Sequence, residues 1–382
     1  MEEKIKSPLI RLEKRSKDSI KPLYAWLIRL GSILFALLLG SVAIVLTGKS
    51  PIKAYGVMIS GALGSTDAFI MSVKNAIPLL GCALAIAPCF KMRFWNIGAE
   101  GQITAGALGA AFVYRMLGSS FVTERGHSSL PLLLLMACAA ILAGGVWALI
   151  PGFFKAKWNT NETLFTLMMN YIIIGVVAWL QAGPWEARQG RMAQFADSAK
   201  LPIVWGIHCG WIIVLALVIL VYVYMRHTKQ GYEIAVIGDS MRTAQYAGMN
   251  VGRIMMRTMF LSGAISGLVG FIIASGTDHT LSKEIAGGVG FTSITVAWLS
   301  QLNAFAMVAI SMMLGVLTKG ADALQTATKI PVSISDIITG LLLFCMLGCE
   351  FFINYRLIFR NKTGKRHEPK ARAGAGKGGA GK

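Results

Sequence analysis

Charge is scarce in this sequence of 382 residues, since only 14% of the residues are charged and 18 acidic side chains face 37 basic ones. With 55% hydrophobic residues and a mean hydropathy of +0.60, this composition excludes an ordinary soluble domain. Strict alternation of apolar and polar residues is also missing, which argues against a membrane β-barrel. The six cysteines form no Cys-x-x-Cys and the five histidines no His-Glu-x-x-His pattern, so we predict no metal site.

The residues that enzymes use are equally hard to find. No nucleophile–base pair stands out, which disfavours a membrane-embedded enzyme. Residues 376–382 have the spacing G-x-x-x-x-G-K of a phosphate-binding loop, but no strand precedes them and no helix follows, as that loop requires. We therefore expect no cofactor and no ATP-binding loop in this chain. Residues 356–382 are predicted to be a basic, disordered tail.

Long apolar runs fill the chain between a basic N-terminal stretch, residues 1–26, and this tail. A bilayer core needs about 20 apolar residues per helix, and helices satisfy their own backbone. Residues 27–355 are therefore predicted to be an all-α integral membrane domain with about ten transmembrane helices, some broken or short. The eighth candidate is too short to cross alone, which indicates a half-helix. The candidate spans are residues 27–47, 69–89, 98–115, 131–153, 163–181, 208–226, 256–275, 289–301, 304–319 and 333–353.

The basic residues predict the orientation of these spans. Ten spans with the N-terminus inside place 26 of the 37 basic residues in cytoplasmic segments or at their edges. This is the positive-inside bias, and it predicts that both termini are cytoplasmic. Because the charges are scattered over several loops, we expect them to meet membrane lipid rather than nucleic acid. No segment has the pattern of a cleaved secretory signal.

One predicted cytoplasmic loop, residues 228–255, is unusually long. Asp239 or Ser240 can cap a short amphipathic helix at 241–247, and Gly248 can end it in a left-handed turn. Two interpretations remain open. The helix rests on lipid headgroups, or it docks a cytoplasmic partner.

The segment "FWNIGAEGQITAGALGAA" at 94–111 combines small residues with polar ones. Its glycines and alanines predict close packing against other helices. Asn96 can cap the segment, and Glu100 in its first turn complements the helix dipole. The alternative is that Glu100 faces a water-filled path, as intramembrane carboxylates often do.

A second segment, "SGAISGLVG" at 262–270, carries two small-xxx-small pairs, Gly263 with Gly267 and Ser266 with Gly270. Close helix packing is the expected role, and a moving hinge is the alternative.

Four stretches carry a resemblance to a known family. The stretch "GDSMRTAQYAGMNVGRIMMRTMFLSGAISGLVG" resembles the coupling-loop region of permease subunits of ATP-binding cassette importers for sugars, nucleosides and branched-chain amino acids. "FWNIGAEGQITAGALGA", "NETLFTLMMNYI" at 161–172 and "AIPLLGCALAIAP" at 76–88 are similar to the purine-nucleoside branch. Together the matches extend from about residue 50 to 350.

This resemblance implies a permease fold like that of the vitamin B12 importer and a translocation path for nucleosides. Simple sugars such as ribose, or branched-chain amino acids, are the alternative substrates. It also implies a cytoplasmic ATPase that binds the ATP, a second and shorter permease subunit, and an extracytoplasmic substrate-binding lipoprotein. The expected location is a bacterial cell membrane.

In the family, the loop between spans six and seven inserts a helix into the ATPase. An acidic residue and two alanines usually stand where this chain has Arg242, Thr243 and Ala244, which puts charge pairing with the ATPase in doubt. The residues predicted to couple to the ATPase are Gly238, Asp239, Arg242, Ala244, Tyr246, Ala247, Gly248 and Met249.

A nucleoside path would use aromatic faces, amides and hydroxyls rather than charges. The candidate path residues of these types, with Glu100 added, are Asn96, Glu100, Gln102, Thr104, Asn170, Tyr171, Trp298 and Asn303. A stand-alone secondary transporter or channel is the remaining alternative. Such a transporter would not need the glycine-bracketed loop at 228–255. It more often carries paired charges in the middle of the membrane, and Glu100 is the sole candidate for such a charge here.

Overall fold

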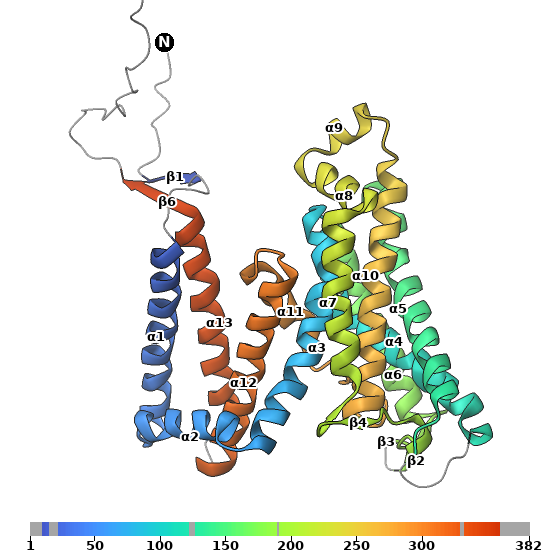
Figure 1. The fold of residues 1–382 in the computed structure, drawn as a ribbon, viewed down its shortest axis with the longest axis horizontal. Coiled ribbons are helices and arrows are strands. Elements are labelled where there is room, and N and C mark those ends of the chain that lie inside the picture. The colour runs from blue at the N-terminus through green and yellow to red at the C-terminus, as the bar shows by residue number, and fades with distance from the viewer. Residues whose placement is uncertain (1–9, 15–21, 122–126, 189–190, 329–331, 360–382) are drawn as a thin grey trace, which may run out of the picture. The chain divides into compact units, whose positions relative to one another are not determined.

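The computed structural model describes residues 10–14, 22–121, 127–188, 191–328 and 332–359 (Figure 1). They fall into two units, one from the two ends of the chain, within 1–31 and 348–382, and one comprising 32–347. Most of the predicted basic tail lies outside the described residues, and so does much of the N-terminal stretch.

In the unit formed by the chain ends, β1 (Ile10–Lys14) pairs antiparallel with β6 (Tyr355–Phe359), with Ile10 opposite Phe359. The sequence analysis predicted neither strand. Within residues 32–347, the segment between α6 and α7 forms two small antiparallel pairs. They are β2 (Glu186–Arg188) with β3 (Arg191–Met192), and β4 (Ile203–Val204) with β5 (Ile207–His208).

A helix lies at each of the ten predicted spans. The helices at these spans are α1 (Pro22–Leu46), α3 (Thr66–Lys91), α4 (Ala99–Leu117), α5 (Leu130–Trp158), α6 (Glu162–Ala182), α7 (Gly210–His227), α10 (Val251–Ile273), α11 (Val289–Leu299), α12 (Ala304–Thr328) and α13 (Val332–Asn354). A π-helical turn, Ala274–Asp278, extends α10. The remaining α-helices among the described residues are α2 (Pro51–Leu63), α8 (Lys229–Asp239) and α9 (Met241–Tyr246).

Six of the described helices are long and apolar enough to cross a membrane alone, or seven spans if α1 and α2, bent by 113°, count as one. The chain is thus an all-α integral membrane protein. Glu100, Gln102 and Arg115 lower the hydropathy of α4, which is not among the six. With 11 residues, α11 is about 16 Å long, which confirms that it is too short to span.

Two helices were missed by the sequence analysis. α2 begins with Pro51 at its first turn and lies across α12, where Gly61 approaches Ala323 and Gly320 approaches Met58. α8 occupies the first half of the loop at 228–255, which was predicted to hold a single short helix.

Within residues 32–347, α4, α5 and α10 pack closely against one another (Figure 1). Glycines bring their backbones into direct contact along a seam. A Cβ atom added at Gly106 of α4 would overlap the backbone of Gly267 in α10. Gly144 of α5 meets the backbone of Gly263 and Gly267 in the same way. The predicted packing role of the small residues at 262–270 is therefore confirmed.

Burial differs sharply between the spans. In their most apolar windows, α3 and α10 are 67% and 78% buried, whereas α6 and α7 are only 28% and 22% buried. The exposed faces of α6 and α7 are apolar, so they suit lipid or another apolar protein surface.

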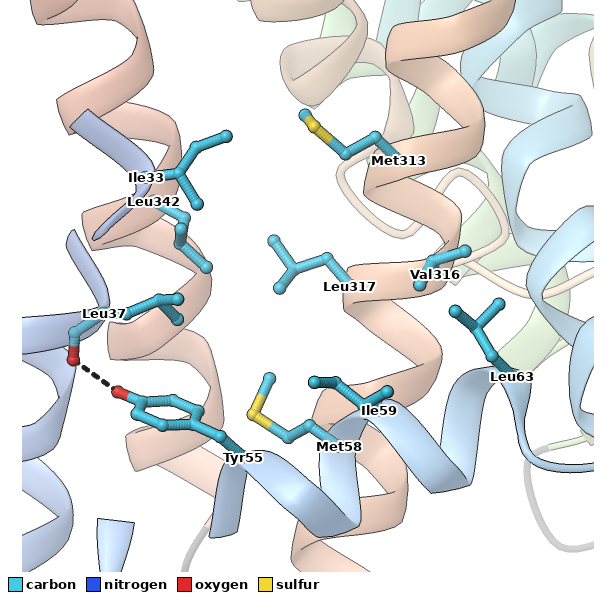
Figure 2. Close-up of a pocket in the computed structure, with 11 residues that line it drawn as sticks. Ile33, Leu37, Tyr55, Met58, Ile59, Leu63, Met313, Val316, Leu317 and Leu342 are labelled. Carbon is cyan, nitrogen blue, oxygen red and sulfur yellow. Dashed lines mark hydrogen bonds between the residues drawn. The ribbon is translucent and has the colours of Figure 1, made fainter. Parts of the chain in front are cut away.

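A purely apolar cavity of about 260 Å³ lies where α2 passes between α12 and the described parts of α1 and α13 (Figure 2). The Tyr55 hydroxyl at its edge donates to the Leu37 carbonyl at 2.6 Å. This bond satisfies a polar group that has no water nearby in a membrane. The other lining residues are Ile33, Met58, Ile59, Leu63, Met313, Val316, Leu317, Gly320 and Leu342.

The seam generates a prediction about helix packing. Gly267→Ala should lower the melting temperature of the detergent-solubilised protein, because the new methyl overlaps backbone and overpacking costs about 1–3 kcal/mol. Gly175→Ala in α6 is the matched control, since nothing lies within 4 Å of its Cβ position. Alanine there should leave the melting temperature unchanged or raise it slightly. Equal effects of the two substitutions on thermal melting would contradict the seam.

Candidate functional site

The link between α3 and α4, residues 92–98, is the first part of the site. Asn96 in this link is fully buried. Its Nδ2 donates to Gln102 Oε1 at 3.3 Å and to Ser262 Oγ of α10 at 3.0 Å, and Gln102 Nε2 donates to Asn96 Oδ1 at 3.1 Å. Asn96 Oδ1 also accepts from the Gly98 N–H at 3.0 Å. The side-chain amides of Asn96 and Gln102 therefore form two reciprocal hydrogen bonds, and Asn96 connects the start of α4 to α10 through Ser262.

Asn170 of α6 completes the first turn of α4. Its Oδ1 accepts from the Gly101 N–H at 2.8 Å, and its Nδ2 donates to the Ile97 carbonyl at 3.0 Å. The Ile97 N–H donates to Thr166 Oγ1, also on α6, at 3.2 Å. Because the first N–H groups of a helix have no partner within it, these contacts replace the water that a membrane lacks.

Glu100 reaches across to a different helix. Its Oε1 accepts from the Gly288 N–H at 2.7 Å and its Oε2 from the Gly290 N–H at 2.8 Å, at the N-terminus of α11. The negative carboxylate thus meets the positive end of the α11 dipole. Gly290 has no room for a side chain, since a Cβ there would press on the Glu100 backbone and carboxylate. We name the contact between Glu100 and residues 288–290 the clamp.

The clamp changes the interpretation of Glu100. The sequence analysis assigned its carboxylate to the start of its own helix or to a water-filled path. The structure gives the carboxylate protein N–H partners on α11. The neighbouring Thr104 hydroxyl is likewise occupied, since it donates to the Glu100 carbonyl at 2.9 Å.

The other candidate path residues lie apart from the clamp. Tyr171 is 63% exposed on the outer face of α6. Asn303 caps α12, where its Oδ1 accepts from the Phe305 N–H at 3.0 Å. Trp298 in the last turn of α11 stacks on Trp95 of the link, with ring centroids 5.5 Å apart, and Phe90 lies against both rings. Both indoles are partly exposed, so they offer an aromatic surface beside the buried amides.

The loop at 228–255 folds as predicted around α9. Ser240, rather than Asp239, caps this helix, since its Oγ accepts from the Thr243 N–H at 3.2 Å. Gly248 follows with φ +75°, the left-handed conformation expected there. Figure 1 shows α9 at the far end of this loop, beyond the ends of α7 and α10.

The residues of the predicted coupling set divide into two groups. Ala244 is fully buried and Gly238 lies against the Lys91 carbonyl, so these two residues hold the loop together. Met249 is partly buried, and Tyr246 is 92% exposed. Asp239, Arg242, Ala247 and Gly248 are also exposed.

An apolar cluster connects this loop to the link. Ala244 of α9 and Ile234 of α8 share one buried cluster with Met92 and Phe94, the latter two residues before Asn96. The beginning of α10 belongs to the same cluster through Ile254. A displacement of α9 therefore acts on close-packed side chains that end beside the Asn96 amide pair.

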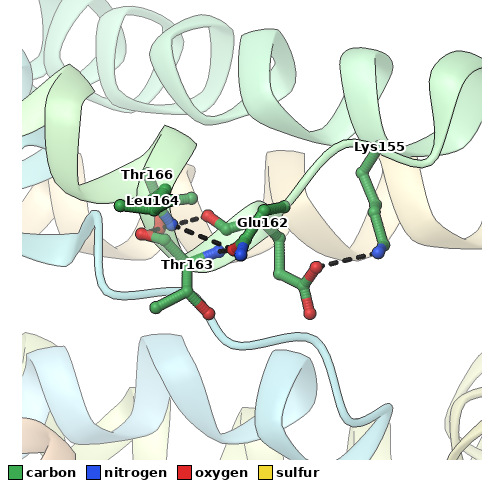
Figure 3. Close-up of polar contacts among 6 residues, drawn as sticks. Lys155, Glu162, Thr163, Leu164 and Thr166 are labelled. Atoms are coloured by element: carbon green, nitrogen blue, oxygen red, sulfur yellow. Dashed lines mark hydrogen bonds and ion pairs between the residues drawn. The ribbon is translucent and has the colours of Figure 1, made fainter.

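The turn between α5 and α6 lies against the same link (Figure 3). Asn161 caps α6, with its Oδ1 accepting from Thr163 and Leu164 N–H groups at 3.1 and 3.2 Å. Lys155 and Glu162 form an ion pair of 2.8 Å, and both side chains are less than 20% exposed. The sequence analysis did not single out this pair, although "NETLFTLMMNYI" was recognised as a motif.

Comparison with known proteins identifies the family. The profile described as branched-chain amino acid transport system / permease component matches residues 68–347. This range holds the link, the clamp and the loop at 228–255. The chain belongs to this family. It is a transmembrane permease of the kind found in ABC importers.

Curated relatives span most of this permease. A glucose ABC transporter permease protein of Haloferax volcanii is 31% identical, over 85% of this chain and 88% of its own length. A guanosine ABC transporter permease protein of Bacillus subtilis is 29% identical, over 85% and 93%. A nucleoside ABC transporter permease protein of Lactococcus lactis is 26% identical, over 87% and 93%. No solved structure matches.

The clamp predicts that the Glu100 carboxylate stabilises the fold, and a substitution at this position tests the prediction. Glu100→Gln keeps the shape but removes the charge, and its amide N–H₂ meets a backbone N–H instead of accepting from it. We expect a loss of about 1–3 kcal/mol in stability, because charge-assisted bonds to a buried acceptor are lost. The measurements are thermal melting of the purified protein and substrate uptake, both of which should fall.

Glu284→Gln is the matched control, since its carboxylate is exposed and 3.9 Å from Lys283. That substitution should change neither the melting temperature nor uptake. If Glu100→Gln behaves like this control, the clamp is dispensable.

Proposed function

We propose that this permease forms the translocation path of an ATP-driven nucleoside importer in a bacterial cell membrane. The ATP is bound and hydrolysed by a separate cytoplasmic ATPase. A substrate-binding lipoprotein delivers the nucleoside from outside, and a second, shorter permease subunit completes the path.

Two kinds of observation support nucleosides as the substrate. The guanosine and nucleoside permeases named above align with 93% of their length. The stacked Trp95 and Trp298 present partly exposed aromatic faces, which suit a flat base. The glucose permease at 31% identity favours a sugar as the second candidate, and the family description includes branched-chain amino acids.

The observation that carries the mechanism is the continuous cluster from Ala244 of α9 to Phe94 of the link. We propose that the ATPase binds the exposed side of α9 and displaces this helix as ATP is bound and released. The cluster passes this motion to the link, where Asn96 holds α10, and to the start of α4, where Glu100 holds α11. α11 starts inside the bundle, so its displacement changes the path without moving a full span.

The orientation proposed from the basic residues agrees with the packing. The link, the α5–α6 turn and the loop at 228–255 are all predicted to be cytoplasmic, and the structure packs them against one another. The strands β4 and β5 would then lie outside.

Cysteine labelling tests this orientation. On a cysteine-free background, Ile203→Cys in β4 should react with a membrane-impermeant reagent added to intact cells, since this residue is 72% exposed. Tyr246→Cys should react only after the membrane is opened. The opposite pattern of labelling would overturn the proposed orientation.

Uptake by the reconstituted complex tests the substrate and the energy source. Labelled guanosine should accumulate only with ATP, and excess unlabelled nucleoside should block it while glucose, ribose and leucine do not. Accumulation without ATP would identify a stand-alone transporter, and competition by a sugar alone would identify the second candidate.

The coupling role of α9 predicts the effect of losing its exposed aromatic ring. Tyr246→Ala should weaken ATPase docking by on the order of 2 kcal/mol, because buried aromatic residues dominate such interfaces. Gly248→Val should also impair docking, since a β-branched residue resists a φ of +75°. The measurement is ATPase stimulation by loaded binding protein in reconstituted vesicles.

Tyr232→Ala is the matched control, since Tyr232 is an equally large and 65% exposed residue on α8. It should retain most of the stimulation. Normal stimulation and uptake in both α9 variants would leave this helix as an interfacial helix on lipid headgroups.

A further inference from the structure

A groove of about 520 Å³ opens between α7 and α10, and α8 closes one end of it. α5 contributes its floor through Leu149. α7 and α10 both qualify as membrane spans and α7 is only 22% buried, so the groove opens on a face that suits lipid. It is separate from the clamp and from the aromatic surface of Trp95 and Trp298. The lining residues are Leu149, Tyr224, Gln230, Arg253, Met256, Arg257, Phe260 and Leu261.

The two ends of the groove differ in chemistry. Arg253, Arg257 and Gln230 lie where α10 meets α8, at the end of the spans that carries the long loop. Phe260 and Leu261 continue along α10 beyond Arg257, and Met256 lies between the two arginines in the sequence. Arg253 and Leu261 are eight residues apart, about 12 Å along a helix. A charged mouth thus leads into an apolar channel that points toward the middle of the membrane.

The charge at the mouth is positive. Arg257 lines the groove and pairs with Glu233 of α8, which does not line it, with Nη2 and Oε2 3.2 Å apart. Among the residues that the structure describes, no acidic side chain lies within ion-pair distance of the Arg253 guanidinium. Two guanidinium groups and one carboxylate leave an excess positive charge at this end of the spans.

We propose that this groove binds one anionic phospholipid. The phosphate lies between Arg253 and Arg257, with Gln230 as a further donor, and an acyl chain follows the apolar wall to Leu261. Arginine suits a phosphate because its planar fork offers two parallel donors. A free phosphate or a nucleotide would use the mouth but leave the apolar wall empty, so a lipid matches both halves of the groove.

The proposal depends on α7 and α10 crossing the membrane, and on neither the substrate nor the partners proposed above. Arg257 would then bind the lipid phosphate while it pairs with Glu233 of α8, the helix that precedes α9. The lipid therefore connects the composition of the membrane to the segment that we assign to ATPase coupling.

Lipid retention by the full-length chain tests the proposal. The protein is placed in nanodiscs of equal parts phosphatidylglycerol and phosphatidylcholine, and retained lipid is counted by native mass spectrometry after delipidation. One phosphatidylglycerol should remain bound in preference to phosphatidylcholine. Arg253→Gln with Arg257→Gln should lower its retention about 30-fold, taking about 1 kcal/mol per basic residue at the membrane surface.

Three controls make the result specific. Lys157→Gln removes an exposed charge from the last turn of α5, outside the groove, and should change retention by less than about two-fold. Leu261→Trp narrows the apolar channel without changing charge and should also weaken retention. Arg253→Gln alone breaks no ion pair of the described fold, so it reports on the lipid even if the double variant unfolds.

Equal retention of the two lipids, or an equal loss with Lys157→Gln, would overturn the proposal. Displacement of the lipid by millimolar inorganic phosphate, with no effect of Leu261→Trp, would overturn it as well, because the site would then recognise phosphate alone.

Discussion

Two hydrogen bonds from the N-terminus of α11 to the Glu100 carboxylate decide how the middle of this membrane protein is assembled. A helix that begins inside a bilayer carries backbone N–H groups that lipid cannot satisfy. A carboxylate satisfies them and also meets the positive end of the dipole. The buried charge of Glu100 and the interrupted helix α11 therefore explain one another, since each would be costly without its partner.

The clamp in turn depends on the amides around it. Asn96 and Gln102 pair with one another and hold α4 to α10, while Asn170 holds the same turn to α6. The helices α8 and α9, which we propose meet the ATPase, pack on the link that contains Asn96. The buried polar residues and the apolar cluster of the loop thus form one connected arrangement. It extends from α9, which carries the exposed Tyr246, to the N-terminus of α11.

Much of this architecture could be predicted from the sequence because it depends on local patterns. Apolar runs predicted a helix at each of ten places. Asp239 or Ser240, with Gly248, predicted both ends of α9, and the structure shows Ser240 as the cap. α2 was missed because its 13 residues are too few for a span, and α8 because its sequence mixes polar and apolar residues.

The partners of the buried polar residues could not be predicted, because they are far away in the sequence. Glu100 and Gly288 are 188 residues apart, and no periodicity connects them. The pair Gly287–Gly288 before a short apolar run was the available signal for the start of α11. Asn170 was proposed for the substrate path from its residue type alone. In the structure its side-chain amide is hydrogen-bonded to Ile97 and Gly101 at the start of α4. A path role for these residues stays a prediction.

The seam of glycines between α4, α5 and α10 has a mechanical consequence. Where Gly106, Gly144 and Gly267 bring backbones into direct contact, no flexible side chain is left to absorb sliding of one helix past another. These three helices must therefore shift together, as a single block. In the transport cycle proposed above, opening and closing would therefore fall to the elements around the block, which are α6, α7 and the short α11. The rigid unit of this permease is set by its smallest residues.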